Sequence, residues 1–410
     1  MPQEDRQLDR PWKRDRTKPH ALHGLLSRPG SLPPALARHF IDAFSAPGDL
    51  VLDPFCGKGT VILEAALRGR NCIGFDLAPD ALVAARAKVD VPSMRSVKEL
   101  LGSLDGIQSY PARVPWQVRA FFSDGTLGQI LSIRDGLLTA VAEEAGARAR
   151  AARFVLGAML GILHGHSRFS LSLPCSHSFA MAPGYVIKYA REHRLRRPYR
   201  NVNECLAARV EQVTSDPPPA IRGRAVYGDA SRLVCTGKDL TGIVDLIVTS
   251  PPYLNVQTYA KDGWLRLWLL GVDYREVSKQ LIQTGSPTTY LRRMKPCLDE
   301  MLRVLKPDRR AVLIAGDAPV NSGHTKTFFK TGEHLAKLAS SCSVSGFTFT
   351  TEEIIEDTIP AHARYYSAVH KDGKRQEVEE GRKGVRLERV VVLKKTALHD
   401  HLSGGKLAHS

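Results

Sequence analysis

The sequence predicts an α/β protein with a doubly wound sheet that one helical insertion interrupts. Short apolar runs recur along the chain, and each ends in a Gly or Asp turn, as strands buried on both faces of a parallel sheet do. Helical patterns lie between these runs, and this alternation is typical of a doubly wound sheet. The rhythm breaks only between about residues 96 and 218.

Five strands are expected from the apolar runs. The helical stretch VILEAALRGR follows the first of them, and TTYLRRMKPCLDEMLRVLKP precedes the fifth. The insertion carries its own helical stretch, LLTAVAEEAGARARAARFVLGAMLGILHG, and leaves through the Pro cluster SDPPPAIRGR, which is typical of a linker. The predicted strands are 50–53, 72–76, 225–229, 244–248 and 311–315.

The composition points to a polyanionic partner. The chain has 410 residues, with 58 Lys and Arg against 42 Asp and Glu, a formal net charge of +16 and a pI near 9.6. A protein that sits on a polyanion gains affinity from counterion release, so nucleic acid is the partner that this charge favours. A basic charge that serves only solubility stays open as the alternative.

The cysteines and the N-terminus indicate a cytoplasmic protein. The seven cysteines are scattered without a Cys-x-x-Cys pair, which favours reduced thiols and argues against a structural zinc site. The N-terminal stretch MPQEDRQLDRPWKRDRTK lacks the apolar core of a signal peptide. No window approaches the roughly 20 apolar residues that a membrane span needs.

The first predicted strand ends in a Gly-rich turn within LVLDPFCGKGT. In a doubly wound sheet, ligands bind beyond the carboxyl ends of the strands, where such a turn feeds a helix. Gly57 and Gly59 carry no side chains, so the backbone can approach a ligand closely. A phosphate loop requires G-x-x-x-x-G-K-[ST] and a dinucleotide loop requires a third Gly, and this turn offers neither.

S-adenosylmethionine is the ligand that remains, because it is cationic and carries no phosphate. Asp53 ends the first predicted strand and suits the sulfonium and ammonium charges. Asp76 ends the second strand, where it is placed to accept both ribose hydroxyls, and Asp229 ends the third, where it is placed to accept the adenine amino group. Three acids in register on consecutive strands therefore predict a site for this cofactor.

The fourth predicted strand runs into the sequence TSPPY. Its two prolines supply no N–H donors, which leaves the carbonyls of Ser250 and Pro251 free to face a ligand. A planar exocyclic amine is a poor nucleophile, but accepting both of its hydrogens turns its lone pair toward a methyl donor and stabilises the developing charge. Tyr253 is expected to stack on an extruded base. A rigid Pro-Pro turn over a packed aromatic ring is the alternative.

These motifs resemble those of the amino-methyltransferases that act on DNA. The family's motifs are commonly D-P-F-x-G-S-G-T and [D/N/S]-P-P-[Y/F/W], against DPFCGKGT and TSPPY here. The upstream stretch LLSRPGSLPPALARHFIDAFSAPGDL looks like the family's segment over the methionine end of the cofactor, and LDEMLRVLKPDRRAVLIAGD looks like its fifth helix and strand. MLGILHG and FAMAPGYVIKYAREH are similar to segments of solitary members, and the matched motifs cover about half the chain.

The resemblance implies a Rossmann-like class I methyltransferase with a seven-stranded, doubly wound mixed sheet. In the family, the Ser form of the second motif is associated mostly with N4 of cytosine, and the Asp or Asn form mostly with N6 of adenine. The cofactor-binding residues that it implies are Asp53, Phe55, Cys56, Gly57, Gly59, Thr60, Asp76 and Asp229. The catalytic residues that it implies are Ser250, Pro251, Pro252 and Tyr253.

The sequence departs from the family in two ways. Lys58 stands where Ser is usual, and we expect its side chain to point into solvent. The cofactor motif also precedes the catalytic one, whereas many Ser-type enzymes are circularly permuted the other way. Boundaries of target recognition therefore do not transfer from the family to this chain.

Two competing chemistries find little support. Methylation at carbon 5 of cytosine needs a thiolate, usually in a Pro-Cys pair after the fourth strand. Cys175 and Cys297 each follow a proline, but neither follows that strand. His164 and His166 suggest a metal pair without a third ligand spaced nearby, so structural histidines are favoured and no metal is expected.

The stretch Val186–Arg200 of the insertion is strongly basic and contains Tyr189 and Tyr199. Phosphate contact with some base stacking is the functional interpretation, and a solvated basic helix face is the alternative. The run Lys371–Arg389 is also basic but diluted by Glu, so a solvated hairpin and a second DNA contact both stay open. The candidate nucleic-acid-binding residues are Lys188, Arg191, Arg194, Arg196, Arg197 and Arg200.

The sequence thus predicts an enzyme that transfers a methyl group from S-adenosylmethionine to N4 of cytosine in double-stranded DNA, with the base flipped out of the duplex. A cognate restriction endonuclease is a candidate partner. Adenine N6, a base in RNA, and a non-catalytic nucleic-acid-binding module regulated by the cofactor stay open. The expected segments are a flexible basic N-terminus (1–20), a cofactor-binding half (21–95), a helical insertion for target recognition (96–218), a catalytic half (219–395) and a flexible tail (396–410).

Overall fold

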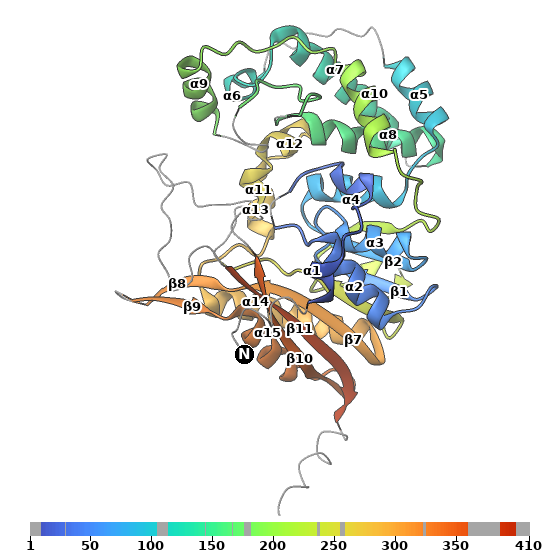
Figure 1. Cartoon of the computed structure of the whole chain (residues 1–410), viewed down its shortest axis with the longest axis vertical. Helices are drawn as coiled ribbons and strands as arrows, with labels where there is room; N and C mark the ends of the chain where they lie inside the picture. Colours follow the sequence, from blue (N-terminus) through green and yellow to red (C-terminus); the bar gives the residue numbers. More distant parts are fainter. Residues whose placement is uncertain are drawn as a thin grey trace, which may run out of the picture.

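A seven-stranded mixed sheet lies at the centre of the computed structural model of the chain (Figure 1). The structure describes residues 10–28, 30–104, 114–143, 145–165, 167–175, 182–235, 238–254, 259–322, 325–359 and 386–398. The strands of the sheet are β1 (Leu50–Asp53), β2 (Asn71–Asp76), β3 (Arg224–Tyr227), β6 (Val244–Thr249), β7 (Leu305–Gly316), β10 (Phe347–Ile359) and β11 (Arg386–Ala397). All five strands predicted from the apolar runs are present.

The strand order is β10-β11-β7-β6-β1-β2-β3. The five strands from β3 to β7 pair in parallel, and β11 is antiparallel to both of its neighbours. The prediction of a seven-stranded, doubly wound mixed sheet is confirmed. β2 and β6 lie on opposite sides of β1 in the sheet. The strand order therefore reverses between β1 and β6, and doubly wound sheets bind ligands at such a point.

Helices cover both faces of the sheet because its strands are apolar on both sides. Val51 and Val248 pack with α2 (Pro34–Phe44), α3 (Thr60–Leu67) and α4 (Pro79–Val89) on one face. Leu52 and Ile247 pack with α14 (Pro287–Val304) and α15 (Thr331–Ser340) on the other. The alternation of neighbouring residues between the two cores follows from the two-residue period of a strand.

The insertion between β2 and β3 has a core of its own and lies on α4. Its helices are α5 (Met94–Ser103), α6 (Trp116–Arg119), α7 (Asp124–Ala142), α8 (Gly146–Ile162), α9 (Pro183–Glu192) and α10 (Val202–Val213). Two glycines let α8 approach closely: a Cβ on Gly157 would lie 2.9 Å from Cβ of Ala87, and one on Gly161 would lie 2.0 Å from the carbonyl oxygen of Leu25. The insertion is therefore anchored beside the first half of the sheet.

Three short helices lie between the sheet and the insertion helices (Figure 1). They are α11 (Tyr259–Asp262), α12 (Trp264–Leu269) and α13 (Tyr274–Gln280). The remaining elements are α1 (Pro11–Arg14), the 3-10 helix η1 (Ala21–Gly24), and the hairpin strands β4 (Val234–Cys235), β5 (Lys238–Asp239), β8 (Ala318–Ser322) and β9 (Thr325–Phe329). No helix within the described ranges is both long enough and apolar enough to cross a membrane.

The described residues near the N-terminus pack on the fold, although the sequence indicated a flexible segment. We expected residues 1–20 to be flexible, but in their described part, residues 10–20, the buried Trp12 donates a hydrogen bond from Nε1 to Oδ2 of Asp357 at 2.8 Å. Lys13 forms an ion pair with the same carboxylate. The N-terminal segment therefore packs on β10. At the other end β11 continues to Ala397, and residues 399–410 lie outside the described residues.

Candidate active site

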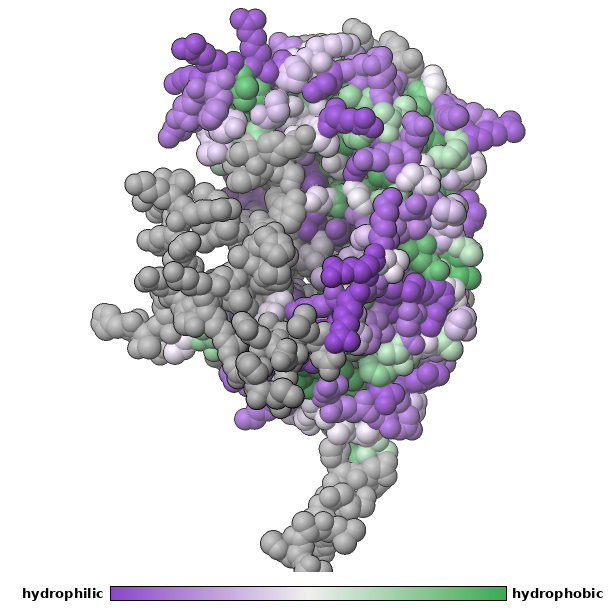
Figure 2. Space-filling view, viewed as in Figure 1, coloured by the Kyte–Doolittle hydropathy of each residue, from purple (hydrophilic) through white to green (hydrophobic). Residues whose placement is uncertain are grey.

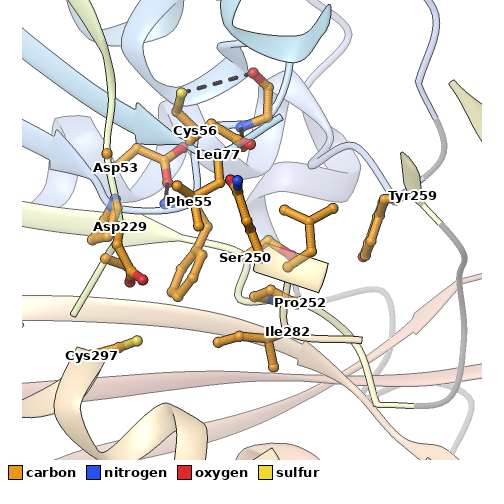
Figure 3. Close-up of a pocket in the computed structure, with 18 of the residues that line it drawn as sticks. Asp53, Phe55, Cys56, Leu77, Asp229, Ser250, Pro252, Tyr259, Ile282 and Cys297 are labelled. Atoms are coloured by element: carbon orange, nitrogen blue, oxygen red, sulfur yellow. Dashed lines mark hydrogen bonds between the residues drawn. The ribbon is translucent and has the colours of Figure 1, made fainter. Parts of the chain in front are cut away.

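The turns after β1 and β6 open onto one cavity of about 340 Å³ (Figure 3). Asp53 and Gly57 line it from the first turn, and Ser250 and Pro252 line it from the second. Asp229 lines it from the end of β3. The cavity lies where the strand order reverses, so the Gly-rich turn and the Ser-Pro-Pro turn face a common ligand space.

Most of the residues singled out in the sequence come together in this cavity. Those that line it are Asp53, Phe55, Cys56, Gly57, Thr60, Asp76, Asp229, Ser250 and Pro252. Gly59, Pro251 and Tyr253 are not among the lining residues. These three lie in the same two turns, next in sequence to residues that do line the cavity.

The shape of the first turn depends on its two glycines. Gly57 has φ +50° and Gly59 has φ +79°, values that residues with a side chain adopt rarely. A Cβ on Gly59 would lie 2.9 Å from the Cα of Ala85 in α4, whereas one on Gly57 would meet nothing within 4 Å. Gly57 therefore opens the turn to the cavity, and Gly59 allows the start of α3 to pack against α4.

Asp53 connects the two turns. Its Oδ1 accepts a hydrogen bond from Oγ1 of Thr249 at 2.6 Å and another from the backbone N–H of Phe55 at 3.2 Å. Burial raises the pKa of Asp53 to about 7, and the hydrogen bonds from Thr249 and Phe55 oppose that rise only partly. A buried carboxylate of this kind favours a cationic ligand, because the positive charge stabilises its ionised form.

Asp76 holds the Gly-rich turn in place. Its Oδ2 accepts from the backbone N–H of Gly57 at 2.8 Å, and its Oδ1 accepts from that of Ala78 at 2.7 Å. Burial raises its pKa, although the nearby guanidinium of Arg28 opposes the rise. Each carboxylate oxygen retains a second lone pair that a ribose hydroxyl can use. Asp229 is exposed to the cavity and accepts from the backbone N–H of Ser231 at 2.8 Å.

Lys58 does not point into solvent, contrary to the expectation from the sequence. It is half-buried and lines the cavity, and burial lowers its pKa to about 8, with the positive charge of Arg266 adding to the shift. The fully buried Lys88 donates from Nζ to the carbonyl oxygen of Lys58 at 2.7 Å and fixes this part of the turn. The sequence marks this position through the replacement of the usual Ser by Lys. The placement of the Lys58 side chain depends on α4 and α12, which carry Lys88 and Arg266.

Ser250 is the start of a directed pair of hydrogen bonds. Its Oγ donates to the phenolic oxygen of Tyr253 at 3.2 Å, and that phenol donates to Oε1 of Glu388 at 2.7 Å. Glu388 is a buried residue of β11, and sequence reasoning missed it. Tyr259 of α11 is an aromatic residue that does line the cavity (Figure 3), whereas Tyr253 does not.

The described residues that the competing chemistries would use are in unsuitable states. Cys297 lines the cavity from α14, but burial raises the pKa of its thiol to about 12, so the thiolate needed for attack on a base does not form near neutral pH. The buried His164 lies 2.6 Å from Oγ of Ser172 through Nδ1 and packs edge-on against Phe121. His166 lies outside the described residues. The part of the chain that the structure describes contains no cluster of three His, Cys, Asp or Glu side chains able to hold a metal.

The basic stretch of the insertion spans α9 and the segment after it, in a mostly hydrophilic corner of the surface (Figure 2). Lys188, Arg191, Arg194, Arg196 and Arg197 are exposed, whereas Arg200 is half-buried and its backbone N–H donates to Oγ1 of Thr126 at 2.7 Å. Of the two tyrosines in this stretch, Tyr199 is 63% exposed, whereas the half-buried Tyr189 stacks on His193 at 3.9 Å between ring centroids. Of the second basic run, residues 371–385 lie outside the described residues.

The sheet order and the two turns on one cavity define a class I methyltransferase fold. A family model described as DNA methylase matches residues 2–86 and 244–372, more than half of the chain, so the chain belongs to the DNA methylase family. Its cofactor is S-adenosylmethionine. The cavity fits that molecule, because its donor set combines buried carboxylates for cationic groups with a turn that brings backbone close to the ligand.

The relatives include proteins described as acting on different nucleic acids. The Type II methyltransferase M.MjaII of Methanocaldococcus jannaschii is 30% identical over 89 residues, 22% of this chain and 16% of that protein. The DNA adenine methyltransferase YhdJ of Escherichia coli is 38% identical over 74 residues, 18% and 25% of the two chains. A tRNA (guanine(10)-N2)-dimethyltransferase of Methanothermobacter thermautotrophicus is 44% identical over 50 residues, 12% and 15% of the two chains. The aligned segments thus span a quarter or less of these relatives.

Solved structures of methyltransferases also resemble the chain. A SAM-dependent methyltransferase of Methanosarcina mazei covers 87% of this chain and 97% of its own, with 11% sequence identity and a TM-score of 0.33.

Proposed function

We propose that this protein transfers a methyl group from S-adenosylmethionine to the exocyclic N4 of a cytosine in double-stranded DNA. The observation that carries the proposal is the common cavity, in which Ser250 faces the same space as Asp53 and Gly57. An amine held at the Ser-Pro-Pro turn and a cofactor held at the Gly-rich turn would therefore meet. Ser at the first position of the second motif supports cytosine, as the family resemblance implies.

Each carboxylate of this cavity would contact a different part of the cofactor. Asp53 would balance its positive charge, Asp76 would accept from its ribose, and Asp229 would accept from its adenine amino group. The turn through Gly57 would bring backbone against the ligand. When bound, the cofactor supplies an electrophilic methyl group on a sulfonium.

The Ser-Pro-Pro turn would hold the target amine. The hydroxyl of Ser250 donates its hydrogen bond to the phenolic oxygen of Tyr253, so the lone pairs of its Oγ stay available to accept a hydrogen bond from an amine. The carbonyl oxygen of Pro251 would accept the second hydrogen. Both contacts strengthen as positive charge develops on the nitrogen, which makes them contacts to the transition state.

The target base must leave the duplex to reach this cavity, because the exocyclic amine is engaged in base pairing. The cations of the α9 stretch are exposed and would contact phosphates that position the duplex. Arg200 is half-buried and is the weakest of the six proposed nucleic-acid contacts. The proposed assignment of residues 96–218 to target recognition rests on these exposed cations.

Three alternatives differ from this proposal in the substrate or in the absence of chemistry. Adenine N6 is favoured by the similarity to YhdJ, which is described as a DNA adenine methyltransferase. A base in RNA is favoured by the similarity to the tRNA dimethyltransferases. A non-catalytic module regulated by the cofactor would bind nucleic acid without methyl incorporation. A cognate restriction endonuclease and a cytoplasmic location stay predictions from the sequence.

One experiment separates all of these. DNA and RNA are incubated with the protein and a cofactor labelled in its methyl group, and the nucleosides are then analysed by mass spectrometry. We expect label in N4-methylcytosine from DNA. Label in N6-methyladenine or in RNA nucleosides would contradict the proposed substrate and favour adenine or RNA. Nucleic-acid binding without incorporation of label would favour the non-catalytic module.

Replacing Ser250 by Ala tests the proposed site. Loss of one preorganised hydrogen-bonding group of this kind lowers kcat by about 10²- to 10³-fold. Cofactor affinity, measured by titration calorimetry on the same preparation, is expected to stay within about twofold of the unaltered protein, because the proposal places Ser250 against the base and the Gly-rich turn against the cofactor. Retained turnover in Ser250→Ala would remove Ser250 from the mechanism.

A further inference from the structure

Three residues from two distant parts of the chain form a connected path that leads away from the cavity. Ser250 and Tyr253 belong to the turn after β6, and Glu388 belongs to β11, 135 residues beyond Tyr253. In the sheet, Glu388 pairs with Gly316 at the end of β7, which places it beside the end of β6 that carries the turn. A buried carboxylate thus lies two hydrogen bonds from the hydroxyl that lines the cavity.

Both hydrogen bonds of this path point in one direction. Oγ of Ser250 donates to the phenol of Tyr253, and the phenol donates to Oε1 of Glu388. Each donor therefore already faces the group that would receive its proton. The cavity end of the path is an oxygen with free lone pairs, and the far end is a carboxylate, the usual kind of proton acceptor.

Amine methylation needs such an acceptor. Transfer of the methyl group breaks its bond to sulfur, which keeps the electron pair, and forms a bond to the amine nitrogen. The nitrogen then carries a positive charge until one of its two hydrogens leaves as a proton. A mechanism that holds the amine through Ser250 must also remove that proton.

We propose that Ser250, Tyr253 and Glu388 form the exit path for the proton of the methylated amine, with Glu388 as its final acceptor. This inference rests on the proposed function of the cavity. Oγ of Ser250 takes the proton from the nitrogen as its own proton passes to the phenol, and the phenolic proton passes to Glu388. The N–H bond breaks, the carboxylate becomes a carboxylic acid, and Ser250 and Tyr253 end neutral.

The surroundings of the path support this role. Burial and the charge of Glu388 raise the pKa of Tyr253 well above its ordinary range, so the phenol stays protonated and passes a proton on only as it receives another. The next residue, Arg389, extends from the other face of β11 and pairs with Asp317 and Glu333. Its charge is therefore engaged away from Glu388. Tyr253 contributes its hydroxyl to the path rather than a face to the cavity.

Glu388→Gln is the first test, because the amide oxygen can still accept from Tyr253 but cannot take up a proton. Single-turnover methyl transfer to DNA is followed with radiolabelled cofactor, alongside the dissociation constants for cofactor and DNA. We expect the transfer rate to fall about 10²-fold, the low end for loss of a positioned base, with both dissociation constants within about twofold. Tyr253→Phe is expected to cost a similar factor, and the double variant no more than either single one. Glu388→Asp, which restores a carboxylate, is expected to recover part of the rate.

Glu352→Gln is the matched control, since Glu352 lies on β10 and pairs with Arg310 at the surface. A Glu388→Gln protein that transfers the methyl group at the rate of the control, or single losses that multiply in the double variant, would overturn the path and send the proton directly to water. These outcomes leave the proposed function intact, because the unaltered protein remains active. Absence of transfer by the unaltered protein on every nucleic acid would overturn both.

Discussion

Replacing Gly59 by Ala should destabilise the protein far more than an ordinary glycine replacement. The residue has φ +79°, and a left-handed backbone costs a residue with a Cβ about 1–2 kcal/mol. The added Cβ would also lie 2.9 Å from the Cα of Ala85, which is backbone of α4 and is held in place by the insertion behind it. Overpacking of this kind costs about 1–3 kcal/mol, so the free energy of unfolding should fall by about 2–5 kcal/mol.

Gly271 offers a matched control for this replacement. Its φ is +74°, but a Cβ placed there would meet nothing within 4 Å. Urea denaturation followed by circular dichroism should therefore show a loss of about 1–2 kcal/mol for Gly271→Ala, and a clearly larger loss for Gly59→Ala. Cofactor affinity should weaken only in Gly59→Ala, because Gly59 belongs to the turn that lines the cavity and leads into α3, whereas Gly271 lies outside the cavity. Equal losses in the two variants would refute the contact between α3 and α4 as the cause.

Three further predictions concern charge. Affinity for S-adenosylmethionine should rise about tenfold between pH 6 and pH 8, because the pKa of Asp53 is about 7, and calorimetry on Asp53→Asn should lose this part of the pH dependence. The free energy of unfolding should fall by at most about 3 kcal/mol from pH 6.5 to pH 4 in thermal melts, because burial lowers the pKa of His23 to about 4 and the unfolded chain therefore binds a proton on this residue first. His23→Gln should flatten that fall, and an unchanged pH profile in this variant would contradict the role of His23. Replacing Arg191 and Arg194 by Gln should reduce the salt slope of DNA binding by about 2, whereas Arg95→Gln in α5, at the far end of the insertion in Figure 1, should leave the slope unchanged.

The local pattern of the sequence was sufficient to predict the strands of the sheet and the positions of both turns. Apolar runs such as β6 are buried on both faces, and this pattern is a property of the run itself. The turns follow from residues that restrict or free the backbone, such as Gly57 and Pro251. That both turns share one cavity follows from the parallel order of the strands, which brings their carboxyl ends to one edge of the sheet.

The partners of individual side chains were not predictable in the same way. Glu388 belongs to the run Lys371–Arg389, where we interpreted Glu residues only as dilution of a basic charge, and nothing local distinguishes Glu388 from its neighbours. Lys58 was expected to point into solvent, but it is half-buried and lines the cavity, and Lys88 of α4 donates to its carbonyl oxygen. The packing of Trp12 on β10 depends on a contact with Asp357, 345 residues away in the chain.

The sequence by itself determined the kind of fold, the two turns and the residue types at the cavity, because strand burial and turn geometry depend on neighbouring residues. Only the tertiary structure decided which carboxylate lies behind the Ser-Pro-Pro turn and that Lys58 lines the cavity. Those contacts are made by strand pairing and helix packing between residues far apart in the chain, and the local pattern around either partner carries no information about the other.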